Sequence, residues 1–235
     1  MRVLAVIHTP DAGPELFGEV LAEDGHELHV WDIRTQGSPP REVDAVLVFG
    51  GDQNVGEEVQ HPWLHEEYDA LRGWVEDGTP LLGVCLGAQT LAHAFGARVS
   101  QAPVELAGFY ETTLTDAGSS DPVLGVLPRS FEAFNATGYT FEFPESATPL
   151  ADGPVPQAYR IGERAWAVQF HPEIRREHVM TWFHEGSPRP PEEIAAELDE
   201  KLPHWQEHGR RLCRAFLAVA AGEAPPPVPG TVTSV

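Results

Sequence analysis

Short runs of consecutive apolar residues, each bounded by turn-forming residues, mark the first part of the chain. They cover residues 3–7, 45–49 and 80–84 and are apolar at successive rather than alternate positions. Strands that are buried on both faces, as in parallel sheets, have this pattern. Residues 26–31 are expected to add a further strand.

Between these runs, apolar residues recur at helical spacing. One set, which includes Leu16 and Val20, ends before Gly25, and another lies between Pro62 and Gly78. Proline near the start of a helix and glycine just past its end are the expected boundary residues. Strand and helix therefore alternate, which predicts an α/β fold with a doubly wound, mostly parallel sheet flanked by helices.

The pattern changes in the second half of the chain. Residues 106–143 are rich in Thr, Phe and Tyr and in turn-forming residues, which predicts a small antiparallel excursion of short strands. Residues 164–170 then return to the buried-strand pattern. The chain is thus expected to leave the parallel sheet and to rejoin it.

The last part of the chain is expected to be helical and then unstructured. Residues 192–221 have helical periodicity, with a break or restart expected at Pro203. Residues 222–235 contain clustered prolines and no apolar periodicity, which predicts a disordered tail. We therefore expect a single domain over residues 1–221.

The composition of the 235 residues is close to that of an average globular protein, with 42% hydrophobic and 22% charged residues. A fully disordered or collagen-like chain is thereby excluded. Asp and Glu outnumber Lys and Arg by 36 to 15, so the formal net charge is −21. A surface this acidic repels phosphate groups, so we expect neither nucleic acid nor an anionic membrane as a partner.

The two cysteines, Cys85 and Cys213, cannot build a disulfide framework, and the sequence has no Cys-x-x-Cys pair for zinc or an iron–sulfur cluster. The apolar run at residues 3–7 is too short for a signal peptide or a membrane span. We therefore predict a cytoplasmic protein without a metal or a cofactor. Cys213 is expected to be a small core residue of the last helix.

The most informative window is residues 81–92, in which an apolar strand leads through Gly83-x-Cys85-x-Gly87 into a helix. This context is that of a nucleophile elbow. The glycines relieve crowding at a sharp turn, and the turn exposes the sulfur at the carboxyl end of the strand, where open α/β sheets bind ligands. The start of the helix also favours the thiolate form. Cys85 is thus a candidate nucleophile, although a buried structural cysteine has the same local pattern.

A second motif, His171-Pro172-Glu173, follows the strand predicted over residues 164–170. Residues two apart in an extended segment point the same way, so His171 and Glu173 can project together toward the carboxyl edge of the sheet. A thiol nucleophile needs a base, and the base needs a carboxylate that orients it. We therefore predict that Cys85, His171 and Glu173 are catalytic.

The Gly-x-Cys-x-Gly-x-Gln motif that begins at Gly83 and the Phe-His-Pro-Glu motif that begins at Phe170 resemble those of the class I (triad) glutamine amidotransferases. Within that family, the chain resembles stand-alone domains similar to the amidotransferase half of GMP synthase. The resemblance covers residues 1–185, so the helix predicted over residues 192–221 is a C-terminal extension. It implies a flavodoxin-like fold.

The resemblance also implies a role for each residue of the triad. Cys85 would attack the side-chain amide of glutamine, His171 would act as the base and then as the acid for the departing ammonia, and Glu173 would be the partner of His171. The backbone N–H groups of Gly51 and Leu86 would bind the oxyanion, because only a glycine lets the backbone approach a tetrahedral intermediate so closely.

Other positions carry over as substrate contacts. Gln89, one helical turn beyond the cysteine, matches the family residue that contacts the substrate glutamine, and Gly138 and Tyr139 match a loop that supplies main-chain contacts. The chain departs from the family pattern at two places. It has Asp52-Gln53 where relatives usually have Pro, and Thr137 where they commonly have His. These departures bear on the affinity for the substrate or on its identity.

The implied function is a glutaminase that releases ammonia through a γ-glutamyl thioester. About fifty residues follow the matching part, fewer than a typical domain, so a separate synthetase is expected to accept the ammonia. A γ-glutamyl hydrolase that cuts a γ-glutamyl amide or peptide is an alternative on the same scaffold. A catalytically silent interaction module is a third reading, disfavoured because the whole triad is present.

Overall fold

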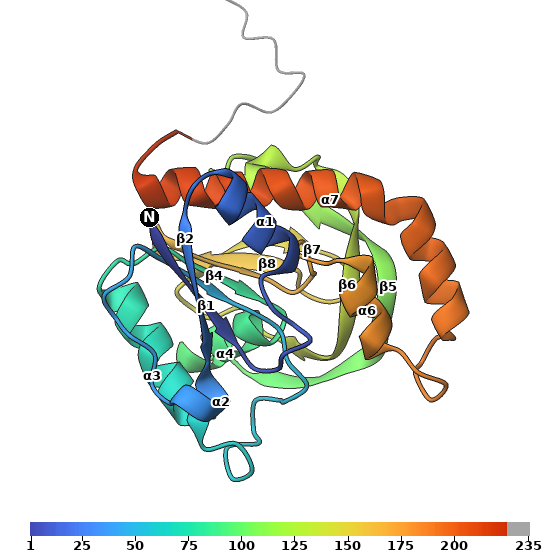
Figure 1. Ribbon diagram of the computed structural model, residues 1–235, viewed down its shortest axis with the longest axis horizontal. Coiled ribbons are helices and arrows are strands. Elements are labelled where there is room, and N and C mark those ends of the chain that lie inside the picture. Colours follow the sequence, from blue (N-terminus) through green and yellow to red (C-terminus); the bar gives the residue numbers. More distant parts are fainter. Residues whose placement is uncertain (225–235) are drawn as a thin grey trace, which may run out of the picture.

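The structure is a computed structural model that describes residues 1–224 (Figure 1). Its strands are β1 (Arg2–Ile7), β2 (Glu27–Asp32), β3 (Ala45–Val48), β4 (Leu81–Val84), β5 (Val99–Leu114), β6 (Ser130–Phe141), β7 (Ala147–Asp152), β8 (Ala158–Ile161) and β9 (Ala165–Val168). Its helices are α1 (Glu15–Glu23), α2 (Ile33–Gln36), α3 (Trp63–Glu76), α4 (Leu86–Ala94), α5 (Asp116–Ser119), α6 (Arg176–Trp182) and α7 (Pro191–Ala221), with a 3-10 turn, η1, at Leu124–Val126.

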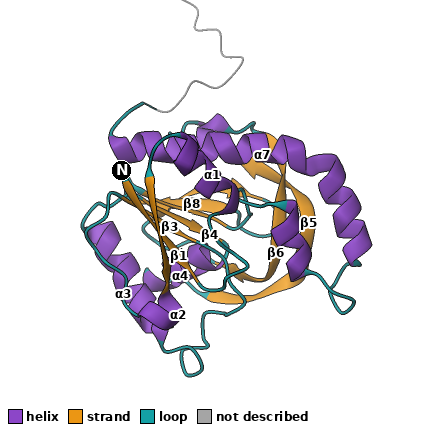
Figure 2. Ribbon diagram, viewed as in Figure 1, coloured by secondary structure: helices purple, strands orange, loops and turns teal. Residues whose placement is uncertain are grey.

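The strands form one nine-stranded sheet in the order β2-β1-β3-β4-β9-β8-β7-β5-β6. β2, β1, β3, β4 and β9 are parallel to one another, whereas β8, β7, β5 and β6 are antiparallel to their neighbours. Helices flank the sheet (Figure 2). The predicted α/β class, with a parallel sheet flanked by helices and an antiparallel excursion, is confirmed.

Alternate residues of the parallel strands pack into two separate layers of core. Val3 and Ala5 of β1 belong to one apolar cluster, whereas Leu4 and Val6 belong to the other. Both layers are buried, which explains why residues 3–7 are apolar at every position. Residues of α1 and α7 complete the first cluster, and residues of α3 and α4 complete the second.

The antiparallel part is larger than the predicted excursion. β5 has 16 residues and begins at Val99, and β6 has 12 residues, so these strands are not short. The first half of β5 is mostly exposed, and Pro103 lies within it. Val99, Ser100 and Gln101 pair with β6, but the register shifts between Gln101 and Leu106. The stretch that contains Pro103 thus leaves the regular pairing, which is why it has no buried apolar pattern.

The expected break at Pro203 is also wrong, because α7 continues through it as one helix. Proline removes one backbone hydrogen bond and crowds the preceding turn, which bends a helix more readily than it ends one when the flanking turns are packed. Leu202 and Trp205 are buried on either side of the proline. Figure 1 shows α7 changing direction along its length.

Two expectations from the sequence concern the C-terminal tail and a membrane span. The disordered tail predicted over residues 222–235 falls mainly on residues 225–235, which lie outside the described residues. Gly222, with a φ of 76°, ends α7 in the left-handed conformation that glycine adopts readily. Among residues 1–224, no helix is both long and apolar enough to cross a membrane.

The arrangement of the parallel strands positions the candidate site. β1, β3, β4 and β9 lie side by side, so the residues that follow them meet at one edge of the sheet. These residues are His8, the pair Gly50-Gly51, Cys85 and His171. Open α/β sheets bind ligands at this edge.

Candidate active site

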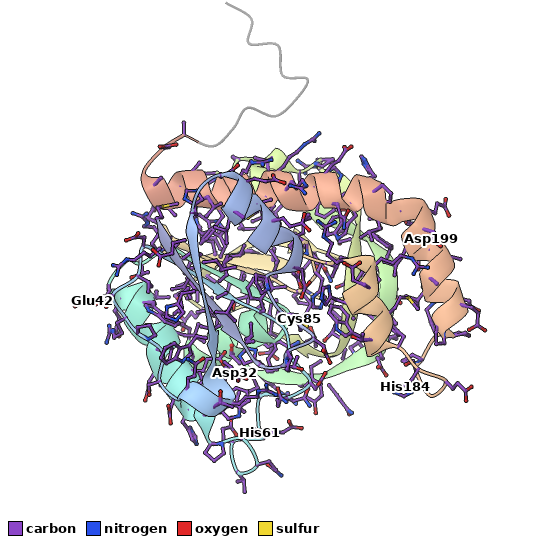
Figure 3. All side chains as sticks on the ribbon, in the orientation of Figure 1. Asp32, Glu42, His61, Cys85, His184 and Asp199 are labelled. Carbon is purple, nitrogen blue, oxygen red and sulfur yellow. The ribbon has the colours of Figure 1, made fainter. Side chains whose placement is uncertain are left out.

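Cys85 occupies a strained turn between β4 and α4. Its φ of 53° and ψ of −107° lie in a part of backbone space that residues other than glycine seldom adopt. Its N–H donates to the carbonyl oxygen of Val168 at 2.9 Å, which ties the turn to β9. Cys85 lies near the centre of the view in Figure 3, and the residue is 7% exposed. Because α4 begins at the next residue, the sulfur lies at a helix N-terminus.

Close packing requires the glycines on either side of Cys85. A Cβ on Gly83 would lie 2.6 Å from the carbonyl oxygen of Gly87. A Cβ on Gly87 would come closer still to the carbonyl oxygen of Val48. Both obstacles are backbone atoms of neighbouring elements, so neither can move aside. The Gly-x-Cys-x-Gly spacing therefore follows from the fit of α4 against the ends of β3 and β4.

His171 and Glu173 follow β9 and form a buried pair. Nδ1 of His171 donates to Oε1 of Glu173 at 2.7 Å, and the side chains are 4% and 2% exposed. The backbone of His171 is held on both sides, because its N–H donates to Phe134 and its carbonyl oxygen accepts from Nε1 of Trp205, both at 2.8 Å. Nε2 of His171 has no hydrogen-bond partner among the described residues. Glu173 thus orients the ring and leaves one nitrogen available.

The charges around His171 favour its protonated form. Burial by itself lowers the pKa of an imidazole, because the buried cation loses its hydration. The electrostatic interactions of His171 with Glu173 and Cys85 outweigh burial and raise the pKa of His171 to about 10.

Gly50 lies where His171 and Cys85 meet. A Cβ on Gly50 would be 3.2 Å from Cε1 of His171 and 3.7 Å from Cβ of Cys85. The structure therefore brings the cysteine, the histidine and, through the histidine, Glu173 to one place. The sequence reasoning assigned a role only to Gly51 and missed the close approach at Gly50.

A cavity of about 610 Å³ opens over these residues, and both Cys85 and His171 line it. Sites for small ligands typically enclose roughly 300–1,000 Å³. Apart from histidines, the ionisable side chains that line the cavity with Cys85 are the carboxylates of Asp52 and Glu105, and no Lys or Arg of the described chain lines it. A cationic group on a ligand would be stabilised there.

Gly51 and Leu86, whose N–H groups the sequence predicts as oxyanion donors, line the same cavity. Within residues 1–224 neither N–H donates to a protein acceptor. A Cβ on Gly51 would lie 2.6 Å from Cβ of His8 and 3.1 Å from Cδ2 of Leu86, so a side chain does not fit. The two residues are thus neighbours, and their N–H groups are available to a ligand.

The predicted substrate contacts differ in their surroundings. The side chain of Gln89 lines the cavity, and its Nε2 lies within 3.1–3.3 Å of oxygens of Thr137, Tyr139 and Gln169. Gly138 and Thr137 also line the cavity, whereas Tyr139 is not among its lining residues. Gln89 therefore holds residues 137–139 at the cavity wall, and these residues belong to strand β6 rather than to the predicted loop.

The end of α6 and the segment that follows it form part of the cavity wall, and the sequence reasoning missed them. Trp182, Phe183 and His184 line the cavity. The ring of Trp182 is 5.0 Å from that of His171, and its Nε1 donates to the carbonyl oxygen of Asp11 at 2.9 Å. No motif marks this segment. Its position follows from β9, which delivers the chain to the same edge of the sheet.

The second cysteine and a pair of histidines on α7 do not line this cavity. Cys213 is fully buried on α7, and burial raises the pKa of its thiol well above the usual range. His204 and His208 share a face of α7, with ring centroids 4.5 Å apart. Over the described range, 1–224, no group of three or more His, Cys, Asp and Glu residues is placed to hold a metal ion. Cys85 is thus the cysteine that is placed for chemistry.

Comparison with known proteins connects this geometry to a family. Residues 15–183 match the family described as Glutamine amidotransferase class-I. The GMP synthase (glutamine-hydrolysing) of Thermotoga maritima is 32% identical over 135 residues, which are 56% of this chain and 25% of the synthase. The match thus spans about a quarter of the length of such relatives. The glutamine amidotransferase-like protein YfeJ of Salmonella typhimurium is 30% identical over 188 residues, which are 76% of this chain and 78% of the relative.

Solved structures share the fold. A glutamine amidotransferase from Thermotoga maritima has a TM-score of 0.81 at 23% identity and covers 94% of this chain and 97% of its own. One from Methylobacillus flagellatus has a TM-score of 0.82 at 21% identity, with 97% and 96% covered. Because nearly the whole chain is covered, the likeness of the fold extends beyond residues 15–183.

Proposed function

This chain belongs to the class I glutamine amidotransferase family, and we propose that it hydrolyses the side-chain amide of glutamine to glutamate and ammonia. Cys85 is the nucleophile, His171 the general base and acid, and Glu173 the carboxylate that orients His171. The observation that carries the proposal is the buried His171, with Nδ1 on Glu173 and Nε2 unpartnered, beside a cysteine at the start of α4.

The first half-reaction forms the thioester. The Cys85 thiolate attacks the amide carbon, a C–S bond forms, and the electron pair of the carbonyl moves onto its oxygen. The N–H groups of Gly51 and Leu86 donate to this oxyanion. When the intermediate collapses, the C–N bond breaks and the imidazolium of His171 gives a proton to the nitrogen, which leaves as ammonia.

The second half-reaction returns the enzyme to its starting state. Neutral His171 accepts a proton from water, the hydroxyl oxygen attacks the thioester carbon, and the C–S bond breaks to give glutamate and the Cys85 thiolate. The same imidazole thus acts as an acid and then as a base. Glu173 keeps the proton on Nδ1 throughout, so that Nε2 faces the reacting atoms.

Substrate recognition uses the cavity wall. Asp52 and Glu105 supply negative charge for the α-ammonium group of glutamine. Gly138 and the neighbouring backbone that Gln89 holds in position supply contacts to the rest of the amino acid. Tyr139 contributes through its main chain.

Ammonia release from glutamine, asparagine and a γ-glutamyl peptide tests the proposal. We expect release from glutamine by the wild type, none by Cys85→Ala, and wild-type release by the matched control Cys213→Ala. Labelling of Cys85 by an electrophilic glutamine analogue should be visible by mass spectrometry. Absence of both release and labelling would instead favour the silent interaction module.

A γ-glutamyl hydrolase remains the second candidate, because the cavity of about 610 Å³ has room for a substituent on the amide nitrogen. Faster turnover of the γ-glutamyl peptide than of glutamine would favour this function. For the glutaminase, we propose that ammonia passes to a separate acceptor enzyme, as the family resemblance implies. Adding candidate synthetases to the assay tests this step, and the cytoplasmic location stays a prediction.

A further inference from the structure

A second buried histidine–glutamate pair lies next to the candidate site, and the proposed reaction does not use it. Nε2 of His8, after β1, is 2.5 Å from Oε2 of Glu67 on α3. Both side chains are sealed from solvent, at 0% and 1% exposure. The ring of Trp63 stacks on His8 with centroids 5.3 Å apart. Neither member of the pair lines the cavity.

The pair connects the two elements that carry the predicted oxyanion donors. On one side, Nδ1 of His8 donates to the carbonyl oxygen of Gly50 at 3.1 Å, in the loop that presents Gly51. On the other side, Oε1 of Glu67 accepts from the hydroxyl of Thr90 at 2.6 Å, on the helix that begins with Leu86. One carboxylate therefore links the glycine loop to α4.

The protonation of the pair follows from these contacts. A carbonyl oxygen only accepts, so Nδ1 of His8 carries a proton. Burial lowers the pKa of His8, but the charge of Glu67 and the hydrogen bonds to Glu67 and Gly50 outweigh it and raise the pKa above the usual value. The contacts of His8 with Glu67 and Gly50 thus favour its protonated form.

The stability of the fold does not by itself explain why His8 and Glu67 form a buried pair. The desolvation of two charges offsets most of their attraction, and apolar residues of similar volume often stabilise a fold as well or better. Most of the other residues that α3 and α4 bury are apolar. The directional hydrogen bonds of His8, Glu67 and Thr90 supply what apolar packing does not, which is a fixed angle between the loop and the helix.

We infer that His8, Glu67 and Thr90 are positioning residues that set the oxyanion site, by aiming the N–H groups of Gly51 and Leu86 at one point. This inference rests on the proposed function for its catalytic consequence. Its structural consequence, a rigid Gly51, can be measured separately.

The structural arm uses Glu67→Gln, which keeps the shape and removes the charge, and Thr90→Val, which removes only the hydroxyl. The matched control is Thr112→Val, at a fully buried threonine of β5 whose hydroxyl has no partner among the described residues. The NMR order parameter of the Gly51 amide should fall from about 0.85, typical of rigid backbone, to below about 0.6 in Glu67→Gln. It should fall less in Thr90→Val and stay unchanged in Thr112→Val. Unchanged Gly51 dynamics in both network variants would overturn the inference.

The kinetic arm separates positioning from general damage. Removal of one oxyanion donor lowers kcat by about 10²–10³-fold, so misalignment in Glu67→Gln should lower it by about 10- to 100-fold, with KM within about threefold. Alkylation of Cys85 by iodoacetamide, which forms no oxyanion, should keep its wild-type rate. If alkylation slows in parallel with kcat, the network has only a structural role and the inference fails. If the wild type hydrolyses no γ-glutamyl compound, the proposed function fails, and the Gly51 dynamics still decide the structural consequence.

Discussion

Two buried histidine–glutamate pairs lie at the same edge of the sheet, and their surroundings are opposite. His171 donates from Nδ1 to Glu173 at 2.7 Å, leaves Nε2 without a partner among the described residues, and borders the cavity. His8 contacts Glu67 at 2.5 Å, uses its other nitrogen for Gly50, and does not border the cavity.

The difference shows what distinguishes a candidate base from a positioning residue. Burial and a raised pKa are common to both histidines, so neither property identifies a catalytic group. The discriminating features are a free ring nitrogen and access to the cavity. A proton acceptor needs both, whereas a residue that fixes backbone geometry needs both nitrogens engaged.

The largest expected effect is loss of catalysis when His171 or Cys85, which line the cavity, is replaced. His171→Ala and Cys85→Ala should each lower kcat/KM by at least about 10⁴-fold, because nucleophile and base act as a unit. The double variant should be little worse than Cys85→Ala alone. Ammonia-release kinetics check this, with Cys213→Ala as the matched control. Activity near wild type in His171→Ala would mean that His171 is not the base, and that the two histidine–glutamate pairs do not differ in catalytic role.

The next effect concerns the free energy of unfolding, which His8→Ala should lower more than His171→Ala. His8→Ala leaves the side chain of Glu67 buried without its partner, which should lower the free energy of unfolding by about 3–5 kcal/mol. His171→Ala should lower it less, because removal of a ring that lines the cavity lets water reach Glu173. Urea unfolding of both variants measures the difference. A larger loss of the free energy of unfolding in His171→Ala would contradict a structural role for the His8–Glu67 pair.

Glu173→Gln should have a smaller effect on rate than loss of His171. The amide still accepts from Nδ1 but no longer stabilises the imidazolium, so kcat/KM should fall by about 10–10³-fold while the thiol and the oxyanion donors remain. Steady-state kinetics with the substrate of the wild type provide the test. A variant as inactive as Cys85→Ala would mean that Glu173 does more than orient and stabilise His171.

The last expected effect is the pH dependence of stability from the His171 pair. The folded-state pKa of about 10 lies above the ordinary value of 6.5, so the pair contributes its full stabilisation below pH 6.5. That contribution should be lost as the pH rises from 6.5 to about 10, because the unfolded chain deprotonates first. Urea unfolding of wild type and His171→Gln from pH 6 to pH 10 measures it. The difference between them should shrink with pH, and growth of the difference would contradict the raised pKa.

The antiparallel region illustrates where local patterns stop being informative. Residues 99–105 carry no buried alternation, because residues 99–101 are placed by pairing with β6, which is distant in the sequence, and residues 102–105 lie where the register of that pairing shifts. Pro203 likewise disfavours a helix locally, yet packing of Leu202 and Trp205 keeps α7 continuous. In both cases tertiary contacts outweighed a local preference.

The sequence by itself determined the parallel strands, the helices α1, α3 and α4, and the placement of Cys85 and His171 after strands, because burial on both faces and sharp turns leave local signatures. Only the tertiary structure decided which side chains meet. Glu67 lies on an ordinary helix, and the wall formed by residues 182–184 has no motif, so neither position indicates its neighbours. Such contacts depend on how separate elements pack at the edge of the sheet, and packing of that kind leaves no periodic pattern along the chain.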